Sequence, residues 1–250
     1  MKVFSVSGYH RTGKTTVVVE LIKELKSRGY KVVSIKDIHS ENFTMEKEGS
    51  NSWKHWQASG DVVIARGQNE TYMIWHRSLS LNEMLDKLDA DWVVVEGMRS
   101  EALPRIICAE NQNELEELID GTVFAISGKY SDDHVFYKDL PVFKAEKDIK
   151  DFTDRVEAKV FDVLPLVKGE CCCECGLSCR EMVVQILAGN KSRDICKTDR
   201  DRNVVIKFNG NDLKIVPYVQ QTFIDVVIGY LQNLKGYKKG SKITIEIDDK

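Results

Sequence analysis

The first sixteen residues constrain the fold of this chain more than any other segment. A short apolar run, Val3 to Val6, leads into Gly8-Tyr9-His10-Arg11-Thr12-Gly13-Lys14-Thr15, and helix-forming residues follow at once. This is the pattern G-x-x-x-x-G-K-S/T between a strand and a helix, which is the setting that a phosphate-binding loop requires. A glycine turn can match the pattern by chance, but the flanking strand and helix argue against that explanation. The segment therefore predicts a nucleoside triphosphate site.

Each residue type in this loop suits the binding of phosphate. Glycines let backbone N–H groups converge on phosphate oxygens, and the start of the following helix adds its dipole. Lys14 would reach the terminal phosphates, and the Thr15 hydroxyl would ligate Mg²⁺. The residues expected to bind nucleotide are Gly8, Tyr9, His10, Arg11, Thr12, Gly13, Lys14, Thr15 and Thr16.

The order of apolar segments predicts an α/β fold. Residues 15–28 have a helical pattern and 31–36 form a strand, which together with the first strand make a right-handed βαβ unit. Further strands are expected at 91–97, 104–108 and 122–126, and a closing helix at 148–164. We expect a P-loop NTPase domain over residues 1–165, with a mainly parallel sheet flanked by helices.

Acidic residues follow two of these strands. Loops at the carboxyl ends of parallel strands face the ligand, which places Asp37, His39 and Glu41 where nucleotide chemistry would occur. The apolar strand at 91–97 ends in Glu96-Gly97, so Glu96 would lie beside the metal's water shell or the attacking water, as the candidate catalytic residue. Arg11 or Arg99 could supply positive charge in the transition state.

The cysteines gather in one region after residue 170. Cys172, Cys175, Cys179 and Cys196 have the spacing C-x2-C-x3-C-x16-C, which suits a 4Fe-4S cluster and resembles the four-cysteine domains of redox proteins. A structural zinc is the alternative, although zinc favours two separated cysteine pairs. Spacing does not fix which of the consecutive cysteines 171–173 is the ligand.

The remaining residues predict a second, small α+β domain over 166–250 that carries the cysteine loop. Asn209-Gly210 predicts a hairpin turn between two strands. A helix is expected over 218–234, with Phe223, Val227, Leu231 and Leu234 on its buried side. Alternating isoleucines predict a last strand over 243–247.

Composition limits the classes of partner. Hydrophobic residues make up 42% and charged residues 30% of the chain, and the formal net charge is −3. This balance favours neither nucleic acid nor an acidic membrane surface as a partner. No apolar run reaches membrane-spanning length, and charges follow the first strand too soon for a signal peptide. We therefore expect a cytoplasmic protein.

Four blocks in the first domain carry a family resemblance: SGYHRTGKTT, SIKDIHSENF, EGSNSWKHWQASG and DWVVVEGMRSEALPRIICA. Their order and spacing resemble the molybdopterin-guanine dinucleotide biosynthesis protein B family. The resemblance implies a homodimeric GTP-binding protein with Mg²⁺ that assists the transfer of GMP to molybdopterin. It also implies a molybdopterin guanylyltransferase or a molybdoenzyme as partner. The choice of GTP over ATP rests on this resemblance, because no N-K-x-D motif is present.

Three functions thus follow from the sequence. The first is a GTP-binding accessory protein of molybdenum or tungsten cofactor synthesis, at most a slow GTPase. The second is an NTP-driven maturation or reactivation factor for a metallocluster. The third is a non-hydrolysing, nucleotide-dependent adaptor that docks onto a molybdoenzyme.

Overall fold

The structure is a computed structural model that describes residues 1–40, 43–166, 175–196, 206–208, 211–213, 217–238 and 243–244. It contains two compact units, Met1–Lys197 and Thr198–Lys250. Among the helices of these described residues, none is both long and apolar enough to cross a membrane.

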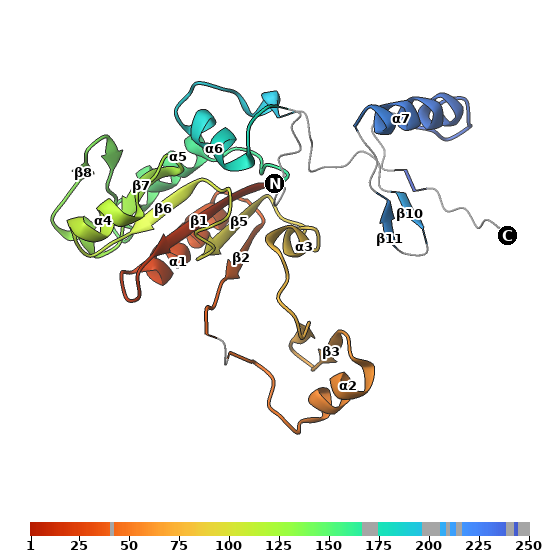
Figure 1. The fold of residues 1–250 in the computed structure, drawn as a ribbon, viewed down its shortest axis with the longest axis horizontal. Coiled ribbons are helices and arrows are strands. Elements are labelled where there is room, and N and C mark those ends of the chain that lie inside the picture. Colours follow the sequence, from red (N-terminus) through yellow and green to blue (C-terminus); the bar gives the residue numbers. More distant parts are fainter. Residues whose placement is uncertain are drawn as a thin grey trace. The chain divides into compact units, whose positions relative to one another are not determined.

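A five-stranded parallel sheet forms the centre of the first unit (Figure 1). The strand order is β2-β5-β1-β6-β7, so β1 is the central strand. β5 and β2 lie on one side of it, and β6 and β7 lie on the other. The strands are nearly continuous apolar runs because both faces of a parallel sheet are covered. Their bounds are β1 (Lys2–Gly8), β2 (Val32–Lys36), β5 (Trp92–Glu96), β6 (Arg105–Cys108) and β7 (Val123–Ser127). This confirms the predicted α/β fold with a mainly parallel sheet.

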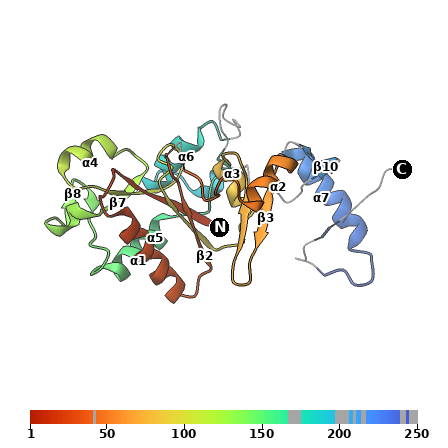
Figure 2. The ribbon, with the colours of Figure 1, turned by 90° about the horizontal axis from the view of Figure 1, so that it is seen from below.

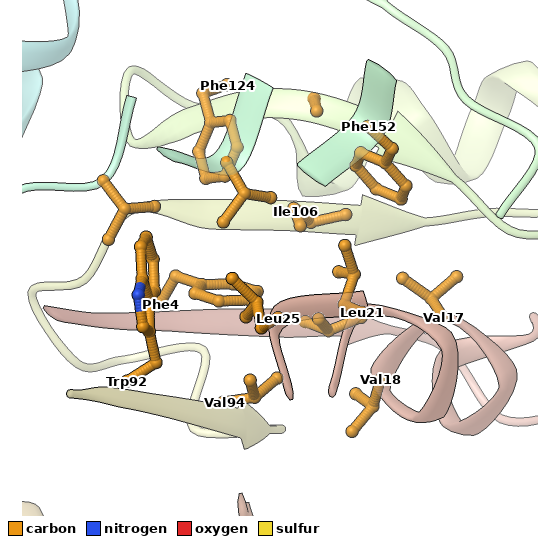
Figure 3. Packing of buried hydrophobic residues seen from close by; sticks show 14 of the residues in the cluster. Phe4, Val17, Val18, Leu21, Leu25, Trp92, Val94, Ile106, Phe124 and Phe152 are labelled. Atoms are coloured by element: carbon orange, nitrogen blue, oxygen red, sulfur yellow. The ribbon is translucent and has the colours of Figure 1, made fainter. Parts of the chain in front are cut away.

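Helices cover both faces of this sheet. On one face α1 (Lys14–Ser27) and α5 (Ile149–Lys159) lie side by side (Figure 2). Phe4 of β1 and Ile106 of β6 pack against Leu21 and Leu25 of α1 there (Figure 3). The opposite face is covered by α3 (Leu81–Leu85) and α4 (Gln112–Leu118).

The closing helix is shorter than predicted. α5 ends at Lys159, where Val160 takes an extended conformation, although residues 148–164 were expected to be helical. Val160 and Leu164 are nevertheless buried in the same cluster as α5. Their apolar character therefore reflects burial in the core and not continued helix.

The helix that follows the cysteines belongs to the first unit. α6 (Cys179–Leu187) buries Met182 and Val183 in the cluster that α1 and α5 also line. A Cβ at Gly121, just before β7, would lie 2.7 Å from Val184 of α6, so this contact is close. Because of this packing the compact units divide between Lys197 and Thr198, whereas the sequence predicted a boundary near residue 165.

The polar, glycine-containing segment 43–60 includes a helix that the sequence did not predict, α2 (Asn51–Ser59). The Ser50 side chain caps this helix by accepting a hydrogen bond from Trp53 N, and Gly60 ends it in the left-handed region. Strands β3 (Val63–Arg66) and β4 (Thr71–Ile74) follow as an antiparallel hairpin, separate from the central sheet.

His76 links two parts of this segment. Glu46 Oε2 lies 2.9 Å from His76 Nε2, and the His76 ring stacks on Trp56 at 3.7 Å between ring centroids. The tryptophan pair Trp53 and Trp56, at 6.4 Å, is thus part of local packing.

The first unit is completed by short elements. A 3-10 turn (Lys129–Asp132) follows β7, and the two-stranded β8 (Phe136–Tyr137) and β9 (Leu140–Pro141) come next. A further 3-10 turn (Arg193–Ile195) follows α6.

The second unit contains a hairpin and a helix. β10 (Ile206–Phe208) pairs antiparallel with β11 (Asn211–Leu213), as the sequence predicted. The predicted buried side of the helix α7 (Pro217–Leu231) is wrong at Phe223, which is 42% exposed, and at Leu234, which lies beyond the helix and is 60% exposed. A unit this small offers little surface to cover an apolar helix. Residues 243–244 are not in a strand, and most of the predicted last strand lies outside the described residues.

Candidate nucleotide-binding site

The loop between β1 and α1 rests on the carboxyl ends of β6 and β7. A Cβ at Gly8 would lie 2.0 Å from the carbonyl oxygen of Cys108, the last residue of β6. Gly128 follows β7 with φ +79°, and a Cβ there would lie 2.2 Å from the carbonyl oxygen of Thr12. Only glycine permits these two approaches, so the loop is held against its neighbours by backbone contacts.

Polar contacts within the loop fix its curvature. The Thr12 hydroxyl donates to the carbonyl oxygen of Tyr9 at 2.9 Å, and the Lys14 ammonium donates to the same oxygen. Lys14 is the first residue of α1, and Gly13 before it is left-handed with φ +97°. The lysine side chain therefore folds back over the loop, where it can bind a phosphate in place of the Tyr9 carbonyl.

Thr15 and Glu96 meet at the junction of the loop and β5. The Thr15 hydroxyl lies 3.1 Å from both carboxylate oxygens of Glu96, and the Lys36 ammonium lies 3.1 Å from Glu96 Oε1. Hydroxyl and carboxylate oxygens are the hard ligands that Mg²⁺ prefers, directly or through water. These residues thus fit a magnesium ion beside the phosphate loop.

Asp37, His39 and Gly97 lie next to this junction. Asp37 N donates to the Glu96 carbonyl at 2.9 Å, and Asp37 Oδ2 accepts from Met98 N at 3.2 Å. His39 Nε2 lies 3.4 Å from Asp37 Oδ2. A Cβ at Gly97, which has φ +105°, would lie 2.8 Å from Asp37 Cβ. The structure therefore brings these three residues together with Glu96, as the positions at strand ends predicted.

The rest of the loop faces outward. His10, Arg11 and Thr16 are exposed, and Arg11 has a left-handed φ of +61°. Tyr9 is 42% exposed and its hydroxyl donates to Glu117 of α4 at 2.5 Å, a bond that raises the pKa of Tyr9. Arg99 donates to the Glu117 carbonyl at 2.8 Å, so its guanidinium is held at α4.

A buried thiol lies beneath the loop. Cys108 has no exposed surface, and burial raises the pKa of its thiol to about 12. The thiol is therefore neutral at physiological pH and serves as a small packing residue.

The described cysteines of the second predicted site pack on one hydrophobic cluster. Cys175, Cys179 and Cys196 are partly buried against the residues that α1, α5 and α6 share. Cys172 lies outside the described residues. Within the described part of the chain, no three Cys, His, Asp or Glu side chains lie close enough to hold a metal ion.

The cysteine segment lies at the edge of the sheet where the strands begin, and the phosphate loop lies at the edge where they end. Arg180 of α6 contacts Asp120 at 2.5 Å, just before β7 begins, and Gly128 at the far end of β7 supports the phosphate loop. At roughly 3.3 Å per strand residue, the five residues of β7 separate the two edges by about 16 Å. A nucleotide in the loop and a metal at the cysteines would not share ligands.

Comparison with known proteins gives the family. The family model described as molybdopterin guanine dinucleotide synthesis protein B (MobB) matches residues 3–128. A molybdopterin-guanine dinucleotide biosynthesis adapter protein of Haemophilus influenzae is 34% identical over half of this chain and 73% of its own length. This chain belongs to the MobB family.

Two further comparisons extend this result. A relative from Methanocaldococcus jannaschii is 24% identical over 99% of this chain and 98% of its own, so both units have a counterpart there. The crystal structure of Bacillus subtilis MobB superposes with a TM-score of 0.53 at 21% identity, covering 68% of this chain and all of that chain. The fold of the first unit is therefore the MobB fold, in a protein of molybdopterin guanine dinucleotide biosynthesis.

Three residues of the site were not singled out from the sequence. Gly128 supports the loop, Cys108 lies beneath it, and Lys36 contacts Glu96. Lys36 ends the second predicted strand, so its position at the carboxyl edge could have been noticed. Gly128 follows an apolar strand, but nothing local shows that the strand ends beside the phosphate loop.

Proposed function

We propose that this MobB-family chain binds GTP with Mg²⁺ in the loop 8–15 and acts as an accessory, adapter-type protein in molybdopterin guanine dinucleotide synthesis. The observation that carries the proposal is the Thr15–Glu96 contact of 3.1 Å beside a glycine-built loop. Loop N–H groups and Lys14 would hold the phosphates, Thr15 would ligate the metal, and Glu96 would lie beside the metal's water shell. The proposed preference for GTP over ATP rests on the resemblance to this family alone.

The geometry supports binding more than rapid hydrolysis. Glu96 could orient an attacking water, but fast phosphoryl transfer also needs extra positive charge on the transferred group. Arg11 is exposed on the loop, and Arg99 donates to the Glu117 carbonyl at 2.8 Å, a contact that would have to break before Arg99 could supply that charge. We infer at most slow GTP turnover, in a homodimer that presents GTP to a molybdopterin guanylyltransferase or a molybdoenzyme.

Replacement of the loop lysine tests the nucleotide site. Lys14→Ala removes a charge-assisted contact to phosphate, which should weaken GTP–Mg²⁺ binding at least about tenfold in isothermal titration calorimetry. Lys23→Ala is the matched control, because Lys23 lies on the same helix and pairs with Glu20 at 2.6 Å. Equal affinity of the Lys14 variant and the parent would contradict the proposal, and ATP in place of GTP tests the base.

We also propose that Cys172, Cys175, Cys179 and Cys196 hold a 4Fe-4S cluster, with structural zinc as the alternative. Soft thiolates suit iron and zinc alike, and their unequal spacing favours the cluster. The support in the structure is that Cys175, Cys179 and Cys196 all pack against one hydrophobic cluster of the first unit.

Anaerobic preparation separates the cluster from zinc. A cluster should give a brown protein that bleaches on reduction, with about four irons and four sulfides per chain. Cys175→Ser, Cys179→Ser and Cys196→Ser should each remove the colour, and GTP binding should persist because the two sites lie at opposite edges of the sheet. A colourless protein with one zinc per chain would refute the cluster.

A further inference from the structure

A second lysine reaches the metal side of the candidate nucleotide site. The Lys36 ammonium lies 3.1 Å from Oε1 of Glu96, and the same carboxylate accepts from Thr15 at 3.1 Å. One carboxylate group therefore separates Lys36 from the hydroxyl that is expected to ligate Mg²⁺. The Lys36 side chain is 57% exposed while that of Glu96 is 11% exposed, so the lysine has more room to move than the carboxylate.

The contacts of Glu96 cannot all persist when nucleotide is bound. With GTP and Mg²⁺ in the site, the Thr15 hydroxyl and the Glu96 carboxylate turn to the metal and its water shell. Lys36 then faces a carboxylate whose charge is already balanced by a divalent cation. An ammonium held beside that cation is repelled by it.

The terminal phosphate is the nearest alternative partner for Lys36. Lys36 ends β2, two strands away from β1 in the sheet order, so it approaches from the side opposite to Gly128. Lys14 approaches the phosphates from the start of α1. The flexible four-carbon stem lets the ammonium turn from Glu96 to a phosphate oxygen without movement of the strand.

We propose that Lys36 is a second phosphate-binding lysine, which pairs with Glu96 in the empty site and with the terminal phosphate of bound GTP–Mg²⁺. The inference rests on the proposed function. It assigns to Lys36 the sensing of the third phosphate, because this phosphate distinguishes GTP from GDP at that end of the site.

The test compares Lys36→Met with the parent in the full chain, by isothermal titration with GTP and with GDP, with Mg²⁺ and with EDTA. The variant should bind GTP–Mg²⁺ about tenfold more weakly, which is the effect of one charge-assisted contact. GDP binding should change less than about twofold, because GDP lacks the phosphate that Lys36 would contact. GTP binding in EDTA should also change less than about twofold, because without Mg²⁺ Lys36 stays on Glu96. Lys36→Arg should recover most of the GTP affinity.

Lys31→Met is the matched control. Lys31 precedes β2 at its other end, is 58% exposed and pairs with Asp89 at 2.6 Å. Its replacement should leave all four affinities unchanged. Equal losses of GTP and GDP affinity in Lys36→Met would show a purely structural role and overturn the inference, as would no loss at all. Failure of the parent to bind GTP would instead refute the proposed function.

Discussion

At the scale of single residues, Glu96 contacts several of the residues that form the candidate site. It is a nearly buried carboxylate at the end of β5 that contacts Thr15 and Lys36 and is backbone-bonded to Asp37. In the proposed function, Thr15 would supply a hydroxyl to the metal, while Glu96 would supply charge and orient water. Substitutions at the two positions should therefore have different effects.

We predict that Thr15→Ala weakens Mg²⁺-dependent GTP binding, because a direct ligand of the metal is lost. Glu96→Gln should leave binding nearly intact and lower any GTP turnover, since a neutral amide cannot accept a proton from water. Titration calorimetry and single-turnover phosphate release measure the two quantities. Equal losses of affinity in both variants would mean that Glu96 is a structural residue at the strand end.

The residues of the loop motif could be placed from the sequence because their function depends on local spacing. Glycine, lysine and threonine at fixed offsets between a strand and a helix are sufficient for that prediction. Gly128 and Lys36 could not be assigned in this way. Their roles depend on which strands lie beside β1, and that order is a property of the folded sheet.

At the scale of elements, α6 joins the cysteine segment to the first unit. Its N-terminus has a capping box, in which Ser178 accepts from Glu181 N at 3.2 Å and Glu181 accepts from Ser178 N at 2.8 Å. Cys179 is the first residue of this helix. The cap therefore fixes the backbone position of Cys179 at the start of α6.

We predict that Ser178→Ala destabilises the first unit by about 1 kcal/mol, the usual cost of losing an N-cap. Ser178→Asp keeps an acceptor at the cap and should restore most of the stability. Urea denaturation followed by circular dichroism measures both. If the two variants were equally unstable, the loss would come from something other than the cap.

Helices with polar exposed faces were the elements hardest to predict. α2 contains no buried residue and lies in a polar segment with glycines nearby, so its apolar periodicity is weak. α4 has only Leu115 and Leu118 buried, and no helix was predicted there. Both begin at a capping side chain, Ser50 and Asn111, which was the available local signal.

At the scale of the whole molecule, one ion-pair network ties β6, β7 and α6 together. Asp120 Oδ2 lies 2.6 Å from Arg105 Nη2 and 2.5 Å from Arg180 Nη2. The Arg105 side chain is fully buried. Burial alone would raise the pKa of Asp120, but hydrogen bonds from Thr122 and the Arg105 guanidinium hold it well below its ordinary value.

We predict that Asp120→Asn lowers stability by about 2 kcal/mol at neutral pH, because it leaves the buried Arg105 guanidinium without its carboxylate. A carboxyl with a lowered folded-state pKa stabilises above its unfolded pKa of about 3.9 and loses that contribution as the pH falls further. The difference between parent and variant should therefore shrink below about pH 4. Thermal unfolding between pH 3 and pH 7 measures it, and a constant difference would contradict the assignment.

The segment 97–104 joins the two edges of the sheet. The segment begins after Glu96 at the nucleotide edge and ends where β6 begins, at Arg105. Along it, Met98 N donates a hydrogen bond to Asp37, and the Ser100 carbonyl accepts one from Arg180. The two edges are about 16 Å apart along β7, so a partner seated on the cysteine edge need not touch the nucleotide itself. Any influence of one ligand on the other would then pass through the protein, along these eight residues and along β5, β6 and β7, which also run from one edge to the other.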